Sequence, residues 1–202
     1  MTMNQVECNG CACGGRAGSE TVDTGAIPAE AAAASELLGR CRALLASLPA
    51  EVYVRPSQVL PGGTVGKHMR HLLDHYFALA GAETPGARID YDHRDRDPAT
   101  ETSVLVGLAM LDRADRQMRA LKRESLERTV RVRSMIDAGG AWADHGSTLG
   151  RELAFATHHA LHHAAMIGAI CRELGVAVDP AFGKAPSTTA HESVLRQEIV
   201  AR

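Results

Sequence analysis

The stretch LGRELAFATHHALHHAAMIGAI, residues 149–170, carries the strongest structural signal in the chain. Its apolar residues recur every three to four positions, which is the period of an amphipathic helix. They form one stripe: Leu149, Leu153, Ala156, Ala160, Ala164, Ile167 and Ile170. We expect a long helix that is capped by Ser147 or Thr148 and ends at Gly175. Its apolar stripe should pack against other helices.

Four histidines lie on this helix: His158, His159, His162 and His163. At about 100° per residue, His163 lies roughly 60° and His159 roughly 100° from the centre of the apolar stripe. The other two lie roughly 160° away. We therefore expect His159 and His163 to point into the protein, one turn apart. His158 and His162 should face solvent, a crossing loop or a second subunit.

A second group of histidines, His68, His71 and His75, lies in another stretch with helical periodicity, residues 64–82. Thr64 is the expected N-cap of this helix. The helical geometry does not choose among the three histidines. Neutral imidazole is a good ligand for zinc, nickel, iron and copper. Two such helices side by side would bring three or more ring nitrogens together, so the sequence predicts a divalent transition-metal site.

The remaining segments predict a mostly helical chain. Residues 29–48 are strongly helix-forming and stop at Pro49, and another helix is expected over residues 99–126. Residues 129–133 alternate apolar and charged side chains before a glycine pair, which predicts a short β-hairpin. The expected fold class is all-α: a four-helix bundle over residues 29–175 with a small β-hairpin insert before the last helix. The polar segments between these elements are expected to be loops.

The two ends of the chain are expected to lie outside the bundle. Residues 1–28 are rich in small and polar residues and predict a flexible tail. Cys8, Cys11 and Cys13 in this tail could bind a soft metal ion, or the tail could be cysteine-rich without forming a site. Residues 176–202 are expected to form an extended segment that packs on the bundle.

The composition restricts the class of protein. Alanine and leucine dominate a hydrophobic content of 45%, and aromatic residues make up only 3%, which favours helices over sheets. The net charge is -2 without a basic patch, so nucleic acid is not an expected partner. No apolar run approaches the ~20 residues that span a membrane, and the first residues lack a secretory signal. We therefore expect a cytoplasmic protein that does not enter a membrane.

Two motifs resemble those of the DinB/YfiT superfamily of bacterial helical metalloproteins. They are TVGKHMRHLLDHY, residues 64–76, and GRELAFATHHALHH, residues 150–163. Members of this superfamily are four-helix bundles with one histidine from the second helix and an H-x-x-x-H pair from the last helix. The resemblance covers about residues 29–175. It implies that His71, His159 and His163 are the metal ligands. Sites of three histidines accept zinc, nickel, iron and other metals, so we expect a divalent transition metal such as zinc, nickel or iron.

The resemblance also implies a class of activity, because characterised members include thiol-dependent transferases and isomerases. We expect a small-molecule substrate, such as a thiol or its adduct. His75 is the candidate catalytic base, with Asp74 and Glu152 as alternatives. Three hypotheses stay open: a metal-dependent hydrolase or thiol transferase, a non-catalytic metal-binding or stress-response module, and a structural bundle. The last would form a homodimer through His158 and His162.

Overall fold

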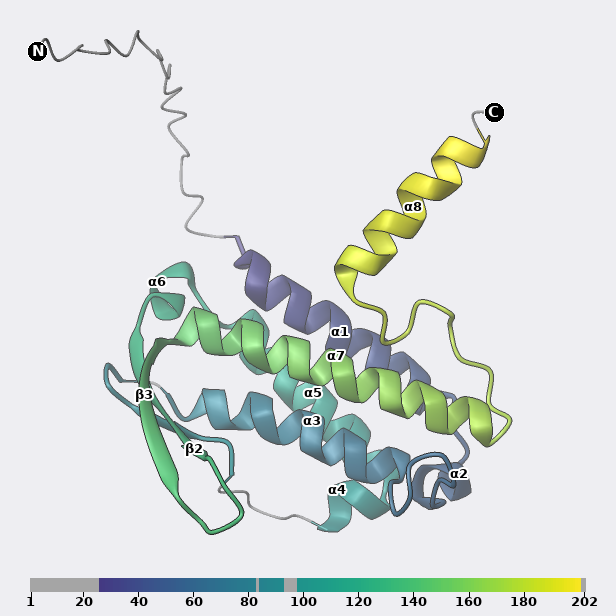
Figure 1. The fold of residues 1–202 in the computed structure, drawn as a ribbon, viewed down its shortest axis with the longest axis horizontal. Helices are drawn as coiled ribbons and strands as arrows, with labels where there is room; N and C mark the ends of the chain where they lie inside the picture. Colours follow the sequence, from purple (N-terminus) through teal and green to yellow (C-terminus); the bar gives the residue numbers. More distant parts are fainter. Residues whose placement is uncertain (1–25, 83, 93–97, 201–202) are drawn as a thin grey trace, which may run out of the picture.

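The computed structural model describes residues 26–82, 84–92 and 98–200, with the side chains of residues 198–200 excepted (Figure 1). Four long helices dominate it: α1 (Ala29–Ala46), α3 (Val65–Ala80), α5 (Val104–Arg119) and α7 (Leu149–Glu173). Helices α1 and α3 each pack against both α5 and α7. The chain is therefore mostly helical, as its composition predicts. It is not purely all-α, because a sheet and a separate C-terminal helix accompany the four long helices.

Hydroxyl caps begin the helices that carry the histidines. The Thr64 hydroxyl accepts a hydrogen bond from the Lys67 amide at 3.0 Å and starts α3, as predicted. The Thr148 hydroxyl accepts one from the Arg151 amide at 3.3 Å and starts α7. Gly175 follows α7 with φ +79°, a conformation that favours glycine and stops the helix. These caps mark the starts of the two helices whose histidines His71, His159 and His163 converge.

The prediction of a single helix over residues 99–126 is wrong. Three helices occupy this region: α4 (Pro98–Thr102), α5 and α6 (Arg123–Leu126). Helix α4 ends before Ser103, whose hydroxyl accepts a hydrogen bond from the Val106 amide and caps α5. Serine offers the backbone this local alternative to a continuous helix. A further short helix, α2 (Ala50–Val54), lies in a segment that was largely expected to be a loop.

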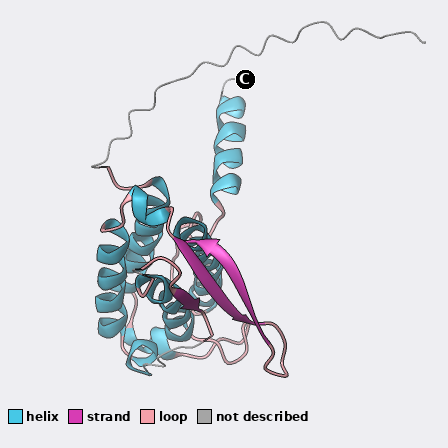
Figure 2. Cartoon of the chain, turned by 90° about the vertical axis from the view of Figure 1, so that its left-hand side faces the viewer, coloured by secondary structure: helices cyan, strands magenta, loops and turns pink. Residues whose placement is uncertain are grey.

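The predicted hairpin is present and belongs to a larger sheet. Strands β2 (Thr129–Met135) and β3 (Trp142–Thr148) are antiparallel, and Thr129 pairs with Thr148. A third strand, β1 (Arg88–Asp90), pairs in parallel with β2 and gives the order β1-β2-β3. This strand was expected to be part of a loop, because three residues are too few to show a strand period. Figure 2 shows the hairpin beside the helices, where β3 leads directly into α7.

The C-terminal segment differs from the extended segment that was expected. Residues 186–200 form helix α8 (Pro186–Val200), which projects from the other helices in Figure 1. The connection before it does pack on them: the Phe182 side chain is 5% exposed, and the Arg40 guanidinium donates to the Ala181 carbonyl at 2.5 Å. Proline at the first position of α8 suits a helix start, because its missing N–H has no helical partner there.

Two further expectations concern the N-terminal cysteines and a membrane-spanning helix. Cys8, Cys11 and Cys13 lie outside the described residues. Among the described residues, no helix combines the length and the apolar character that a membrane span requires.

Candidate metal centre

Three histidines from two helices meet between α3 and α7. The ligand nitrogens of His71, His159 and His163 all lie within 4.8 Å of one another. The closest contact joins Nε2 of His71 to Nε2 of His159 at 2.9 Å. The ring centre of His71 lies 4.5 Å from that of His163. The predicted convergence of His71 with the pair on the last helix is therefore confirmed.

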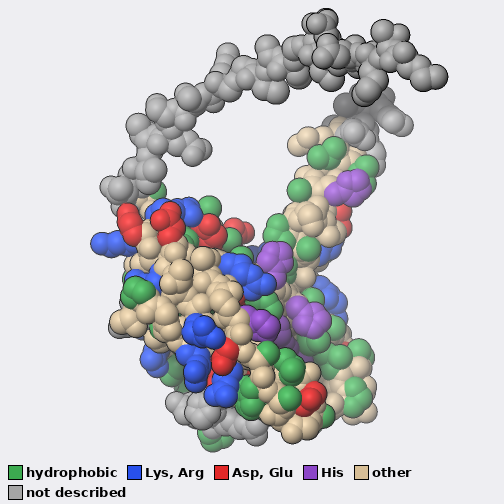
Figure 3. Space-filling view, turned by 60° about the vertical axis from the view of Figure 1, so that its left-hand side comes forward, with side chains coloured by type: hydrophobic (Ala, Val, Ile, Leu, Met, Phe, Trp, Pro, Cys, Tyr) green, Lys and Arg blue, Asp and Glu red, His purple; other side chains and the backbone are tan. Residues whose placement is uncertain are grey.

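This nitrogen set fits a transition-metal ion. A zinc ion binds imidazole nitrogens at about 2.0–2.1 Å, so its nitrogen ligands are about 3.4 Å apart in a tetrahedral arrangement. The two nitrogens of His71 and His159 are closer than this, at 2.9 Å, and all separations in the group lie within 4.8 Å. Small rotations of the rings would therefore bring the three nitrogens to the spacing that a metal ion requires. His163 is 8% exposed, and the other two are partly buried. Figure 3 shows histidine side chains gathered on one face of the molecule.

The electrostatics keep the deepest imidazole neutral. Burial first, and then the like charges of the nearby imidazoles of His159 and His68, lower the pKa of His163 to about 3. Burial also lowers the pKa of His68. A metal ligand must be an unprotonated imidazole. At neutral pH, His163 therefore already has the protonation state that a metal ion requires.

His68, whose role the sequence does not determine, lies next to His163. Its Nδ1 is 3.0 Å from Nδ1 of His163. Its Nε2 is buried and has no hydrogen-bond partner among the described residues. A Cβ atom at Gly63 would lie 2.9 Å from that Nε2 and 3.0 Å from the Leu60 carbonyl oxygen, so the loop packs closely against the His68 ring. His68 therefore contacts His163 at Nδ1, which leaves Nε2 of His163 as the nitrogen that could bind a metal ion.

His75 contacts the centre from the side of the sheet. It is 5% exposed, and its Nδ1 donates to the His71 carbonyl at 3.0 Å. This hydrogen bond places the proton on Nδ1, which makes Nε2 the basic nitrogen of the neutral ring. The ring stacks between His159 at 4.0 Å and Tyr91 at 5.0 Å, measured between ring centres. Its role as catalytic base stays a prediction.

The alternative base Asp74 takes part in an ion-pair network. Its carboxylate is 3.8 Å from Nε of Arg70, one turn earlier on α3. Arg70 also forms an ion pair with Glu101 of α4. Asp74 therefore pairs with a cation of its own helix.

The alternative base Glu152 is only 1% exposed and accepts three hydrogen bonds. The donors are the Tyr91 hydroxyl at 2.9 Å, the Ser147 hydroxyl at 2.6 Å and the Arg151 guanidinium at 2.7 Å. Burial raises the pKa of Tyr91, and the Glu152 carboxylate beside it raises it further. Tyr91 therefore remains a hydrogen-bond donor. The network joins the sheet to the start of α7.

Two cavities flank the histidines. One, of about 450 Å³, is lined by Tyr91, Glu152 and Phe155, together with residues of the hairpin. The Phe155 ring stacks on that of His159, with 5.9 Å between the ring centres, so this cavity lies beside the converging histidines. Sequence reasoning missed Tyr91 and Phe155, although Phe155 precedes His159 by four residues and therefore lies one turn away on the same side of the helix.

The other cavity, of about 470 Å³, is lined by His68, His71 and His163 themselves. The loop of residues 60–63 and the side chains of Lys67 and Arg70 complete it. This cavity gives direct access to two of the three converging histidines, and its charged side chains are basic.

The outer histidines face solvent. His158 and His162 are both exposed, as the helical geometry predicts. The His162 ring centre is nevertheless 5.5 Å from that of His163, at the rim of the centre. Their use in a homodimer interface stays a prediction.

Comparisons with known proteins give little further guidance. No family model matches the chain, and no solved structure matches it. Over 104 residues, 51% of the chain, it is 35% identical to "FK506-binding protein 5" of Rhizopus delemar. This segment covers 27% of that protein, so the chain spans about a quarter of the length of this curated relative. That similarity is too partial to show a family.

Proposed function

We propose that this protein is a divalent-metal-dependent enzyme of the DinB/YfiT type, a hydrolase or a thiol-dependent transferase. One observation carries the proposal: the nitrogens of His71, His159 and His163 converge within 4.8 Å from two separate helices. Three protein ligands leave a coordination position for water or substrate, which is the pattern of catalytic rather than closed structural sites. Zinc, nickel and iron all accept such ligands.

The residues around the centre supply complementary chemistry. A bound divalent ion would act as a Lewis acid and lower the pKa of water or of a substrate thiol. His75, whose proton is held on Nδ1 by the His71 carbonyl, offers a basic Nε2 for proton transfer. The buried Glu152 holds Tyr91 against the His75 ring and so fixes the orientation of this base.

The basic cavity favours a small anionic substrate. Lys67 is exposed, and its ammonium donates to the Gly62 carbonyl at 2.8 Å. Among the described residues no carboxylate forms an ion pair with it, and its ammonium lies at the edge of this cavity. A thiol or thiol adduct that carries a carboxylate would place its anionic group near Lys67 and its sulfur toward the histidines.

Metal content and affinity test this proposal. We expect purified protein to bind one equivalent of zinc or nickel. His159→Ala should weaken binding by roughly 100-fold or more, because even outer partners of metal ligands contribute 10–100-fold. The matched control is His158→Ala, which removes the exposed neighbouring imidazole and should leave the affinity unchanged. Equal affinities in the two variants would refute the proposed centre.

A second candidate function is a non-catalytic metal-binding module. The convergence of His71, His159 and His163 supports it equally, because metal binding needs no catalytic base. A metal-loaded preparation should then turn over no ester, amide or thiol-adduct substrate. Removal of residues 1–28 tests whether Cys8, Cys11 and Cys13 contribute, since an unchanged metal stoichiometry and affinity would exclude them from metal binding.

A further inference from the structure

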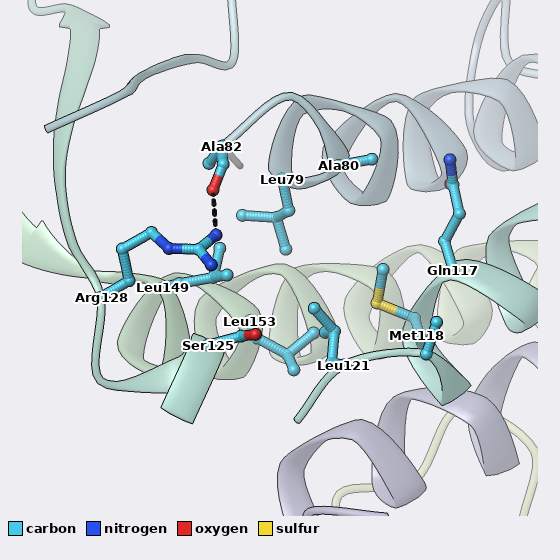
Figure 4. Close-up of a pocket in the computed structure, with 11 residues that line it drawn as sticks. Leu79, Ala80, Ala82, Gln117, Met118, Leu121, Ser125, Arg128, Leu149 and Leu153 are labelled. Atoms are coloured by element: carbon cyan, nitrogen blue, oxygen red, sulfur yellow. Dashed lines mark hydrogen bonds between the residues drawn. The ribbon is translucent and has the colours of Figure 1, made fainter. Parts of the chain in front are cut away.

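A separate cavity lies at the other end of α3, away from the histidines. It has a volume of about 310 Å³ and is formed where the C-terminal ends of α3 and α5 meet the start of α7 (Figure 4). Its volume is within the range of small-molecule sites, roughly 300–1,000 Å³. None of the residues that line it belongs to the metal centre.

The walls of this cavity are apolar and part of the core. Leu79, Met118, Leu149 and Leu153 are each at most 4% exposed. Leu121, which is partly buried, packs against this core from α5's C-terminal end. Because the walls are held by core packing, the cavity is preformed and does not need to open for a ligand.

A cation lies at one end. The Arg128 guanidinium donates to the Ala82 carbonyl through Nη1 at 2.8 Å (Figure 4). This bond uses one of the five N–H donors of the guanidinium. Among the described residues no carboxylate forms an ion pair with Arg128. A carboxylate is the group that best matches a planar guanidinium.

An unsatisfied acceptor lies at the opposite end. Figure 4 shows Gln117 and Arg128 at the two ends of the cavity, with leucines between them. The Oε1 atom of Gln117 is buried and has no hydrogen-bond partner among the described residues. Buried polar atoms are normally paired, and a small rotation of the Gln117 side chain would turn this oxygen toward a donor in the cavity.

We propose that this cavity binds a linear aliphatic carboxylate with a hydroxyl at its far end, an ω-hydroxy acid. The carboxylate pairs with Arg128, the chain runs along the leucines, and the hydroxyl donates to Gln117. This site is independent of the metal centre and of the function proposed for it.

Calorimetric titration with 8-hydroxyoctanoate and octanoate tests the proposal on the full-length protein. Wild type should bind 8-hydroxyoctanoate more tightly than octanoate. Arg128→Gln should weaken both by roughly tenfold or more, because it removes a charge-assisted hydrogen bond. Gln117→Leu should weaken only the hydroxylated acid, also by roughly tenfold. Leu121→Trp should block both by filling the cavity.

Zinc affinity, measured on the same samples, reports whether each variant is folded, because these residues do not line the metal centre. Absence of binding to wild type, an unchanged affinity in Arg128→Gln, or an equal loss for both acids in Gln117→Leu would each overturn the proposal. If wild type binds no zinc but binds the acid, the metal function fails while this inference stands. In that case circular dichroism is used to check that each variant is folded.

Discussion

At the scale of single residues, the centre depends on how each imidazole is held. His163 is buried and has a pKa well below that of a free histidine, so it is neutral before any metal ion arrives. If Nε2 of His163 binds a metal, Nδ1 carries a proton and donates to His68 at 3.0 Å. His68 then acts on the metal through His163 and not as a ligand.

This arrangement predicts the effect of His68→Phe. The substitution keeps a ring of similar size but removes the acceptor for the His163 N–H. Zinc affinity, measured by competition with a chelating dye, should fall by about 10-fold, which is typical for loss of a partner behind a ligand. His162→Phe serves as the control, because His162 is exposed and should change the affinity little. If both variants bind zinc as wild type does, His68 has no part in the centre.

The sequence predicted these residues to different degrees. The pair His159 and His163 followed from its angle to the apolar stripe of α7, which the burial of Ala160 and Ala164 reproduces. The choice of His71 over His68 and His75 came from the resemblance to DinB/YfiT motifs, because all three lie on one flank of α3. The contact of His68 with His163 could not be predicted, since it depends on the relative position of two helices.

At the scale of the elements, close approach of helices is set by small residues. Gly66 lies in the first turn of α3, against α4. A Cβ atom there would overlap the Glu101 carbonyl oxygen and lie 2.9 Å from Cε1 of Tyr53. Tyr53 is itself fixed, because its hydroxyl donates to the Thr100 carbonyl at 2.6 Å. The backbone of α4 therefore has little freedom to move away.

Gly66→Ala should accordingly destabilise the protein by about 2–3 kcal/mol, as overpacking does in a core that cannot shift. The matched control is Gly39→Ala in the middle of α1, where a Cβ atom meets nothing within 4 Å. That change should stabilise the protein by about 0.5–1 kcal/mol through helix propensity. Urea unfolding measures both. Equal effects of the two substitutions would contradict this packing.

The buried thiols allow a test of the α1–α7 interface. Cys41 of α1 and Cys171 of α7 are both 0% exposed. Burial raises the pKa of Cys41 to about 12 and that of Cys171 to about 11. Because the thiolate is the reactive form, both thiols should be unreactive toward a disulfide reagent at pH 8.

The measurement uses a variant with Cys8, Cys11 and Cys13 replaced by serine, so that only the two buried thiols are counted. We expect no rapid reaction in the native state and reaction of both thiols after denaturation. Reactivity should rise only when the pH approaches 11. Rapid reaction of either thiol at pH 8 in the native protein would show that this interface is open.

Element boundaries were less predictable than element types. The long helices and the hairpin have clear periods, so the sequence predicts them. The break at Ser103 was missed because the apolar pattern continues across it, while a single hydroxyl caps a new helix. Strand β1 was missed because it depends on pairing with β2, which is distant in the chain.

At the scale of the whole molecule, the four long helices form the core, and the C-terminal segment packs on this core only through its first part. Phe182 inserts into this core and is 5% exposed, while α8 beyond it projects from the other helices (Figure 1). The connection and α8 should therefore differ in their contribution to stability.

Phe182→Ala should lower the free energy of unfolding by about 3–4 kcal/mol, as removal of a buried phenyl ring does. Deletion of residues 187–202 should lower it by less than about 1 kcal/mol, because surface changes have small effects. Thermal or urea unfolding of both variants gives the comparison. A deletion as costly as Phe182→Ala would mean that α8 is part of the cooperative core.

The most direct test of the account is the position of the metal ion in zinc-loaded crystals, located by anomalous diffraction at the zinc edge. We predict one peak between α3 and α7, at about 2.0–2.1 Å from ring nitrogens of His71, His159 and His163. A peak elsewhere, or a zinc-loaded protein in which the His71 ring stays out of coordination distance, would contradict the proposed metal centre.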